Sequence, residues 1–137
     1  MTILTKENIP HLTRRNSSKL FNLCPGGAQA MIDLLDEVDF IDGEDVLAIY
    51  EDNQLVAWLN YTIEYDKGLK PYYYVGNVLS IKKGYGRLLI EKLQEQELSI
   101  ELVVGFANSD FDKLMKYYES LGFIRKDGQA AFAVWTP

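Results

Sequence analysis

The chain has 137 residues, a length at which one hydrophobic core can stabilise a single domain without disulfides or metals. We therefore expect one domain over residues 1–137. With 47% hydrophobic and 25% charged residues, the composition excludes a disordered or fibrous chain. The 14 Lys and Arg against 20 Asp and Glu give a net charge of −6, which argues against a nucleic-acid partner because phosphate-backbone binders need a basic face.

The cysteine and histidine content limits the chemistry. Cys24 is the only cysteine and His11 the only histidine, so an intramolecular disulfide is impossible and we expect no metal site. No apolar run reaches the roughly 18 residues that a membrane span needs. Residues 1–10 lack the charged start and apolar stretch of a secretory signal. We expect a cytoplasmic protein without a membrane partner.

The N-terminal part predicts a strand, two helices and a hairpin. Pro10 and the polar residues 16–18 interrupt the first helical pattern, whereas the second helix has a clear apolar face from Ala28 onward. Turn-forming residues at 51–54 separate the two strands of the hairpin. The predicted elements are a strand over 1–5, a weak helix over 7–17, a helix from Ala28, and strands over 46–50 and 55–65.

The C-terminal part alternates strands and helices. Gly76 and Asn77 interrupt one strand and indicate a bulge. Gly122 suits the left-handed position after a helix whose inward face carries Phe111, Leu114, Met115 and Tyr118. The predicted elements are a strand over 72–80, a helix from Tyr85, a strand over 100–104, a helix capped by Asn108 or Ser109, and a hairpin over 123–125 and 130–135. The order β-α-α-β-β-β-α-β-α-β-β predicts an α/β fold with a mixed central sheet flanked by helices.

A glycine turn joins the central strand to the helix that follows. A helix that starts directly off the strand through Gly84-Tyr85-Gly86 presents backbone N–H groups to an anion, and a Cβ on either glycine would obstruct a phosphate. Lys82, Lys83 and Arg87 add positive charge in an otherwise acidic chain. The alternative is that the glycines only permit a tight turn. A nucleotide P-loop is excluded because Gly-Lys-Ser/Thr is absent, and a dinucleotide site because Leu89 replaces its third glycine.

Two segments resemble the GNAT N-acetyltransferases. Residues 81–90, Ile-Lys-Lys-Gly-Tyr-Gly-Arg-Leu-Leu-Ile, resemble their acyl-CoA pyrophosphate motif, Arg/Gln-x-x-Gly-x-Gly/Ala. Residues 117–123, Tyr-Tyr-Glu-Ser-Leu-Gly-Phe, are similar to their Tyr-Glu-Lys-x-Gly-Phe segment. The predicted element order also matches the family fold. Ile81 stands where the family has Arg or Gln, and Asn108 lies farther before Tyr118 than the family's asparagine lies before its tyrosine.

The resemblance implies that acetyl-CoA is the co-substrate and that an amine attacks its thioester without an acyl-enzyme. Backbone N–H groups near the central strand's end would polarise the thioester carbonyl, those of the turn would hold the pyrophosphate, and Tyr118 would protonate the leaving thiolate. The cofactor-binding residues implied are Val78, Leu79, Ser80, Lys82, Lys83, Gly84, Tyr85, Gly86, Arg87 and Asn108.

Several assignments stay open. The general base is Glu64, water or a group that the sequence does not identify, and Cys24 is a small hydrophobe rather than a nucleophile. The acceptor is a small-molecule or peptide amine, and the last hairpin could pair two copies as a homodimer. We expect an N-acetyltransferase; the alternatives are a GNAT-fold module that binds CoA or a partner without turnover, and a plain interaction domain.

Overall fold

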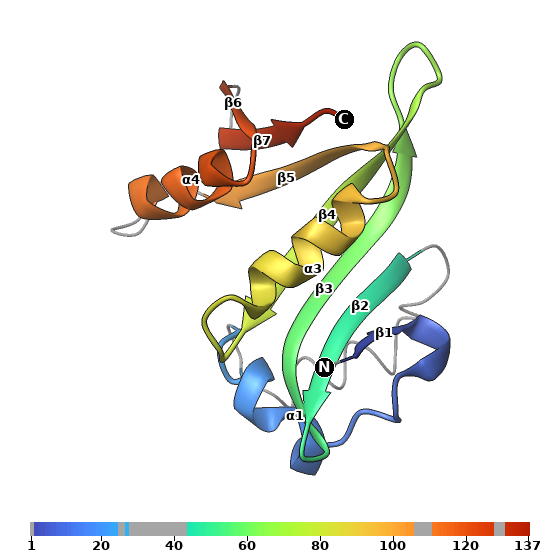
Figure 1. The fold of residues 1–137 in the computed structure, drawn as a ribbon, viewed down its shortest axis with the longest axis vertical. Helices are drawn as coiled ribbons and strands as arrows, with labels where there is room; N and C mark the ends of the chain where they lie inside the picture. Colours follow the sequence, from blue (N-terminus) through green and yellow to red (C-terminus); the bar gives the residue numbers. More distant parts are fainter. Residues whose placement is uncertain (1, 25–26, 28–43, 106–110, 128–130) are drawn as a thin grey trace. The chain divides into compact units, whose positions relative to one another are not determined.

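The computed structural model describes residues 2–24, 27, 44–105, 111–127 and 131–137. Within these residues the elements follow the predicted order (Figure 1). They are β1 (Ile3–Thr5), the 3₁₀ helix η1 (Lys6–Asn8), α1 (Arg14–Phe21), β2 (Glu44–Glu51), β3 (Gln54–Tyr65), β4 (Pro71–Ser80), α3 (Tyr85–Gln94), β5 (Ser99–Gly105), α4 (Phe111–Ser120), β6 (Ile124–Asp127) and β7 (Ala131–Trp135). The helix predicted from Ala28, and Asn108 and Ser109, lie outside the described residues. Among the helices described, none is long and apolar enough to cross a bilayer.

The strands of the described residues form a seven-stranded sheet in the order β1-β2-β3-β4-β5-β7-β6. Strands β4 and β5 pair in parallel, as expected where a helix connects two neighbouring strands. The β1–β2, β5–β7 and β6–β7 pairs are antiparallel. The β4–β5 ladder extends from Tyr72↔Ser99 to Val75↔Leu102, so residues 76–80 of β4 lie beyond it. The interruption predicted at Gly76 and Asn77 coincides with the end of this ladder. The predicted mixed α/β fold is confirmed.

Contacts between Cα atoms divide the chain into two compact units. Unit 1 comprises Met1–Tyr61 and Asn77–Ile90, and unit 2 comprises Thr62–Gly76 and Glu91–Pro137. The boundaries fall within β3, β4 and α3, so each unit contains a part of these elements. A single domain over 1–137 stays a prediction.

Apolar side chains from α1, β2 and β3 form the core of unit 1. Strand β3 is buried without interruption from Leu55 to Asn60, which indicates that both of its faces are covered. The rings of Phe21 and Trp58 meet edge to face, with centroids 5.5 Å apart and an interplanar angle of 82°, a favoured aromatic geometry. The cluster consists of Leu20, Phe21, Val46, Ala48, Leu55 and Trp58.

Helix α1 begins at Arg14 rather than near Glu7, so the predicted start is wrong. Thr13 Oγ1 accepts a hydrogen bond from Asn16 N at 3.2 Å, and Asn16 Oδ1 accepts one from Thr13 N at 2.8 Å. This reciprocal capping box satisfies N–H groups that a helix start otherwise leaves without partners. The polar cluster after Pro10 therefore starts the helix, although the sequence pattern indicated that it interrupts one.

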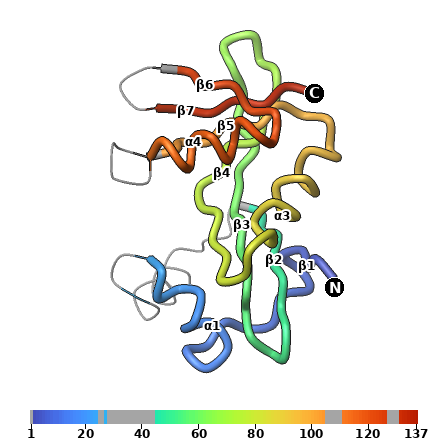
Figure 2. Tube along the Cα trace, turned by 60° about the vertical axis from the view of Figure 1, so that its left-hand side comes forward, coloured from blue at the N-terminus to red at the C-terminus, as the bar shows by residue number. Residues whose placement is uncertain are grey.

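Helix α4 contacts β5, β6 and β7 within unit 2 (Figure 2). Met115 and Tyr118 are buried as predicted, but Leu114 is 38% exposed and does not belong to the inward face. The helix ends in a Schellman motif, in which Gly122 N donates to Glu119 O and Phe123 N to Tyr118 O. Gly122 has a φ of +93°, which confirms the predicted left-handed position.

We expect Gly122→Ala to destabilise the protein. A left-handed backbone costs a non-glycine residue about 1–2 kcal/mol, and an added Cβ would lie 3.2 Å from Trp135 Cδ1. Thermal unfolding of the variant should therefore show a Tm several degrees lower. Gly68→Ala is the matched control, because a Cβ there meets only Asp66 Oδ1 at 3.4 Å. Equal Tm values for the two variants would contradict the assignment.

Candidate functional site

Within unit 1, β4 passes into α3 through a turn over residues 81–84 (Figures 1 and 2). Ser80 Oγ organises the start of this turn, since it donates to Lys82 O at 2.5 Å and accepts from Lys82 N at 3.1 Å. Gly84 has a φ of +91°, and a Cβ added there would meet nothing within 4 Å. The left-handed backbone, rather than crowding by protein atoms, therefore requires glycine at this position.

The start of α3 presents backbone N–H groups without protein partners. Tyr85 N donates to Lys82 O at 3.3 Å, and the ordinary helical ladder begins with the bond from Leu88 N to Gly84 O at 3.2 Å. Within the described ranges, the N–H groups of Lys83, Gly84 and Gly86 have no hydrogen-bond acceptor. Such groups at a helix N-terminus, together with the helix dipole, favour an anion.

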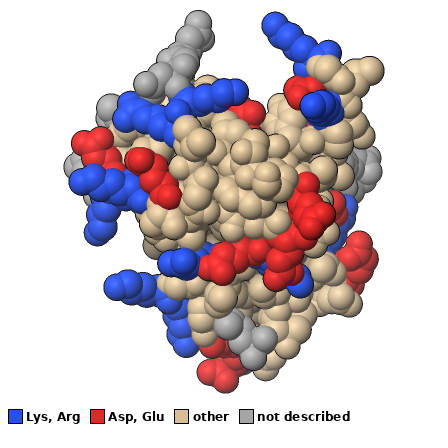
Figure 3. Space-filling view, turned by 45° about the horizontal axis from the view of Figure 1, so that its top comes forward, with Lys and Arg blue, Asp and Glu red and all other residues tan. Residues whose placement is uncertain are grey.

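The three predicted cations of the turn do not share one environment. Lys82, Lys83 and Arg87 are all exposed, but the Lys82 ammonium forms an ion pair with Glu51. Lys83 makes no ion pair in the part of the chain that the structure describes. On the face drawn in Figure 3, basic side chains lie interspersed with acidic ones. Lys83 is therefore an exposed cation of the turn without an ion pair to a described residue, and Arg87 is exposed as well.

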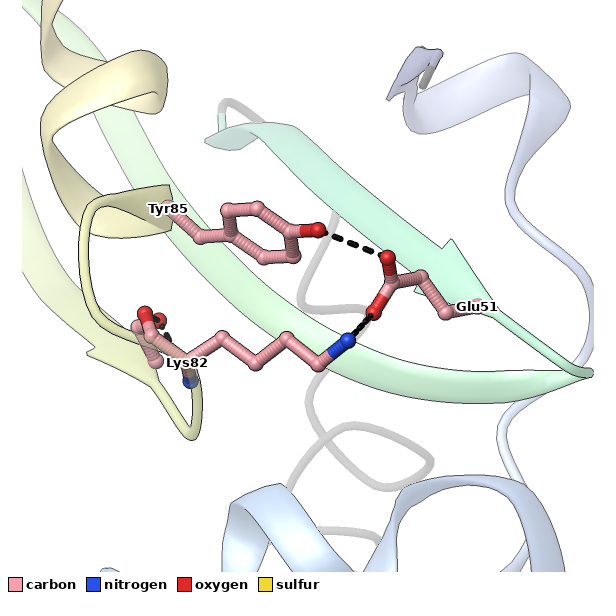
Figure 4. A network of polar contacts seen from close by, with 4 residues as sticks. Glu51, Lys82 and Tyr85 are labelled. Carbon is pink, nitrogen blue, oxygen red and sulfur yellow. Dashed lines mark hydrogen bonds and ion pairs between the residues drawn. The ribbon is translucent and has the colours of Figure 1, made fainter.

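Glu51, at the end of β2, contacts two residues of this segment (Figure 4). Its Oε1 lies 2.5 Å from Lys82 Nζ, and its Oε2 accepts a hydrogen bond from Tyr85 Oη at 2.6 Å. The bonds from Lys82 and Tyr85 lower the pKa of the Glu51 carboxyl, and the same carboxylate raises the pKa of Lys82 and of Tyr85. At neutral pH the carboxylate and the ammonium are therefore charged and the phenol is protonated.

The sequence-based prediction of the site did not include Glu51. In the sequence it belongs to a run of turn-forming residues, and its hydrogen bond to Tyr85 spans 34 positions. The residues around Glu51 in the sequence do not indicate that its carboxylate has a partner so far along the chain. Only the arrangement of the hairpin beside the turn reveals the contact.

The predicted residues at the end of β4 have half-buried side chains. Leu79 packs against the core cluster of unit 1, and the Ser80 hydroxyl is bonded within the turn. The side chains of Leu79 and Ser80 thus have partners within the protein, and contact of the Val78, Leu79 and Ser80 backbone groups with a ligand stays a prediction. These residues lie beyond the ladder that joins β4 to β5.

Tyr118 belongs to unit 2 and is 6% exposed. Its ring contacts those of Tyr117 and Phe123, at centroid distances of 5.2 and 5.7 Å. The Schellman motif fixes it, because its carbonyl accepts the bond from Phe123 N. Burial, with a smaller contribution from Tyr117, raises the pKa of Tyr118 to about 12. The phenol is therefore protonated at neutral pH and chemically able to donate a proton.

The other residues considered from the sequence have ordinary environments. Glu64 is exposed and accepts a hydrogen bond from Thr62 Oγ1 at 3.0 Å. His11 is exposed, and its backbone carbonyl accepts a bond from Asn16 Nδ2. Partial burial raises the pKa of the Cys24 thiol, so little nucleophilic thiolate forms at neutral pH. Among the described residues, no three metal-ligating side chains lie close enough together to hold a metal ion.

The sequence matches no family model and no curated protein. The structure, in contrast, is similar to several solved acetyltransferases. The aminoglycoside 6′-N-acetyltransferase from Enterococcus faecium superposes with a TM-score of 0.71 at 14% identity, over 99% of this chain and 97% of that one. The Bacillus subtilis N-acetyltransferase YlbP, in complex with coenzyme A, gives 0.61 at 16% identity, over 85% and 87% of the chains.

A third similar structure carries an analogue of two substrates. Arabidopsis thaliana Naa50, in complex with the bisubstrate analogue CoA-Ac-MVNAL, gives a TM-score of 0.53 at 16% identity, over 65% of this chain and 70% of that one. These similarities agree in fold with the family that residues 81–90 and 117–123 resemble. The chain therefore has the GNAT acetyltransferase fold.

Proposed function

We propose that this chain is an acetyltransferase that moves an acetyl group from acetyl-CoA to a primary amine. The observation that carries the proposal is the set of partnerless N–H groups at Lys83, Gly84 and Gly86. They occur at the start of α3, beside the exposed cations Lys83 and Arg87. The solved structures of similar fold that contain coenzyme A or a CoA-derived analogue support the same ligand class.

The pyrophosphate of CoA suits the turn chemically. Several backbone N–H groups can bond one diphosphate, and the α3 dipole adds favourable interaction with its negative charge. Lys83 and Arg87 extend the positive potential, while Lys82 is neutralised by Glu51. A phosphate can approach Gly84 closely because no side chain projects from it.

The transfer step needs an attacking amine, a polarised carbonyl and a proton for the leaving group. The amine nitrogen forms a bond to the thioester carbonyl carbon, the carbon–sulfur bond breaks, and sulfur leaves as thiolate. A backbone N–H in the segment from Val78 to Ser80 would stabilise the negative charge that develops on the carbonyl oxygen. Tyr118 would give its phenolic proton to the thiolate, and the amine would lose a proton to water or to a base of the acceptor site.

The class of the acceptor is inferred from the net charge of the chain and from the similar structures. The net charge of −6 favours a cationic amine. The names of the similar structures include both kinds of acceptor, an aminoglycoside and a peptide-derived analogue. We propose a small-molecule or peptide amine, which as an ammonium ion would first lose one proton to water so that its lone pair can attack, and a second proton after the carbon–nitrogen bond has formed.

A second candidate function is CoA binding without transfer. The burial of Tyr118 against Tyr117 and Phe123 favours it, because a tyrosine in such a position commonly serves packing. Ile81 also favours this alternative, because the GNAT motif that residues 81–90 resemble has Arg or Gln at this position. The two candidates differ in whether CoA thiol is released in the presence of an amine.

We expect coenzyme A to stabilise the protein against heat. A ligand at a hundred times its Kd stabilises the folded state by about 2.7 kcal/mol, and the Tm should rise by several degrees. Pantetheine lacks the pyrophosphate and is the matched probe that should give no shift. An unchanged Tm at millimolar CoA would contradict the proposal. Thiol release is then measured with acetyl-CoA and a panel of amines. Release indicates an acetyltransferase, and its absence indicates a protein that binds CoA without transfer.

Gly84→Asp should weaken CoA binding more than Gly84→Asn does. Both side chains tolerate a left-handed backbone better than most, so the two variants share the conformational cost at φ +91°. They differ by one negative charge beside the proposed diphosphate, which should raise the Kd about tenfold in the aspartate variant. Titration calorimetry measures both values. Equal Kd values for the two variants would show that the diphosphate does not bind at this turn.

Tyr118→Phe should leave CoA affinity unchanged and lower kcat by about a hundredfold, the lower end of what general acids contribute. Phenylalanine retains the ring contacts, so we expect an unchanged Tm, and the loss of kcat then does not result from a loss of stability. Tyr117→Phe, the neighbouring tyrosine, is the matched control. Because the pKa of Tyr118 is about 12, deprotonation of this group should not reduce the wild-type rate between pH 7 and pH 10. An unchanged kcat in Tyr118→Phe would exclude the catalytic role.

A further inference from the structure

One carboxylate is bound to both ends of the glycine turn. Glu51 contacts Lys82, at the start of the turn, and Tyr85, the first residue of α3 (Figure 4). The two contacts use different oxygens of the same carboxylate, at 2.5 and 2.6 Å. The Lys82 ammonium also lies 5.8 Å from the centre of the Tyr85 ring, within the range of a cation–π interaction. The three side chains therefore form one network.

The residues of this network lie next to those whose backbone N–H groups have no partner. Lys83 and Gly84 lie between the two contacts in the sequence, and Gly86 follows directly after them. Ser80 Oγ fixes the backbone of Lys82 from the other side of the turn. The residues on both sides of Lys83 and Gly84 are therefore tied through their side chains to one carboxylate of β2.

We propose that Glu51 is a positioning residue for the diphosphate of CoA: by holding Lys82 and Tyr85, it keeps the N–H groups of Lys83, Gly84 and Gly86 in the arrangement that binds the anion. This inference rests on the proposed function. Lys82 accordingly acts through the network, and Lys83, which makes no ion pair with a described residue, is the cation for direct contact with the ligand.

The proposal makes an unusual prediction about sign. A carboxylate close to a bound anion repels it, so electrostatics alone predicts that removing the half-buried Glu51 tightens CoA binding, by about twofold or more. The positioning role predicts the opposite. Without the network, CoA would have to order the turn as it binds, and fixing the backbone of even one residue weakens binding about fivefold. The direction of the change in Kd therefore discriminates between the two effects.

The experiment is calorimetric titration of the full chain with coenzyme A, combined with steady-state kinetics in acetyl-CoA. We expect Glu51→Ala to raise the Kd about tenfold, the effect of ordering one to two residues. The KM for acetyl-CoA should rise with it while kcat is unchanged, which a general loss of structure would not produce. Glu51→Gln retains an oxygen for the Tyr85 hydroxyl and should recover part of the affinity.

Asp52→Asn is the matched control. Asp52 is the next residue and has a left-handed φ of +52° that asparagine also tolerates. This variant removes the same charge from the same hairpin and leaves the network intact, so its Kd should stay within about twofold of the wild-type value.

The outcomes are distinguishable. CoA binding by Glu51→Ala that equals or exceeds the wild-type affinity overturns the positioning role and leaves the proposed function standing. A wild-type chain that does not bind CoA overturns both. If Glu51→Ala does not fold, Tyr85→Phe, which removes one hydroxyl from the network, replaces it in the test. We expect a higher Kd in Tyr85→Phe, and an unchanged Kd overturns the proposal.

Discussion

The short passage from β4 to α3 depends on one backbone conformation. Gly84 adopts a φ of +91°, which lets the chain leave a strand at Ser80 and enter a helix at Tyr85. The first N–H groups of a helix have no acceptor within the helix itself, and here those of Lys83, Gly84 and Gly86 also have none elsewhere in the described residues. Glycine at position 84 thus permits the short connection around which the candidate site is built.

The charges around the turn are arranged more selectively than their number suggests. Three cations lie close together in the sequence, but Lys82 is neutralised by Glu51 and contributes to local order. Lys83 and Arg87 remain exposed. One of the three cations therefore has a carboxylate partner within the protein, and the three do not act as one positive cluster. A count of lysines and arginines alone would have assigned all three to the ligand.

The sequence was sufficient for the strands, because alternating and continuous apolar runs such as residues 55–60 reflect burial directly. It predicted Gly122 correctly for a similar reason, since a left-handed position after a helix has a strong residue preference. It placed the start of α1 wrongly because the capping box of Thr13 and Asn16 uses polar residues that also occur in helix breaks.

The composition of the site was less predictable than its location. The glycines and lysines of the turn are contiguous in the sequence, so a local pattern finds them. Glu51 joins them only through a hairpin that comes 31 to 34 residues earlier. Leu114 shows the same limit, because helical spacing placed it on the inward face and tertiary packing left it exposed. A local pattern therefore locates the residues of the candidate site, whereas only long-range packing reveals which distant side chains contact them.

The aromatic side chains give each unit its own spectroscopic reporter. The chain has two tryptophans. Trp58 lies in the core of unit 1 against Phe21, and Trp135 belongs to unit 2, where its indole faces Gly122 at the end of α4. Replacing either tryptophan by phenylalanine leaves one indole, and its emission, excited at a wavelength that the nine tyrosines do not absorb, reports on the other unit. The cooperativity of the two units in unfolding can thus be observed by intrinsic fluorescence, without an added label.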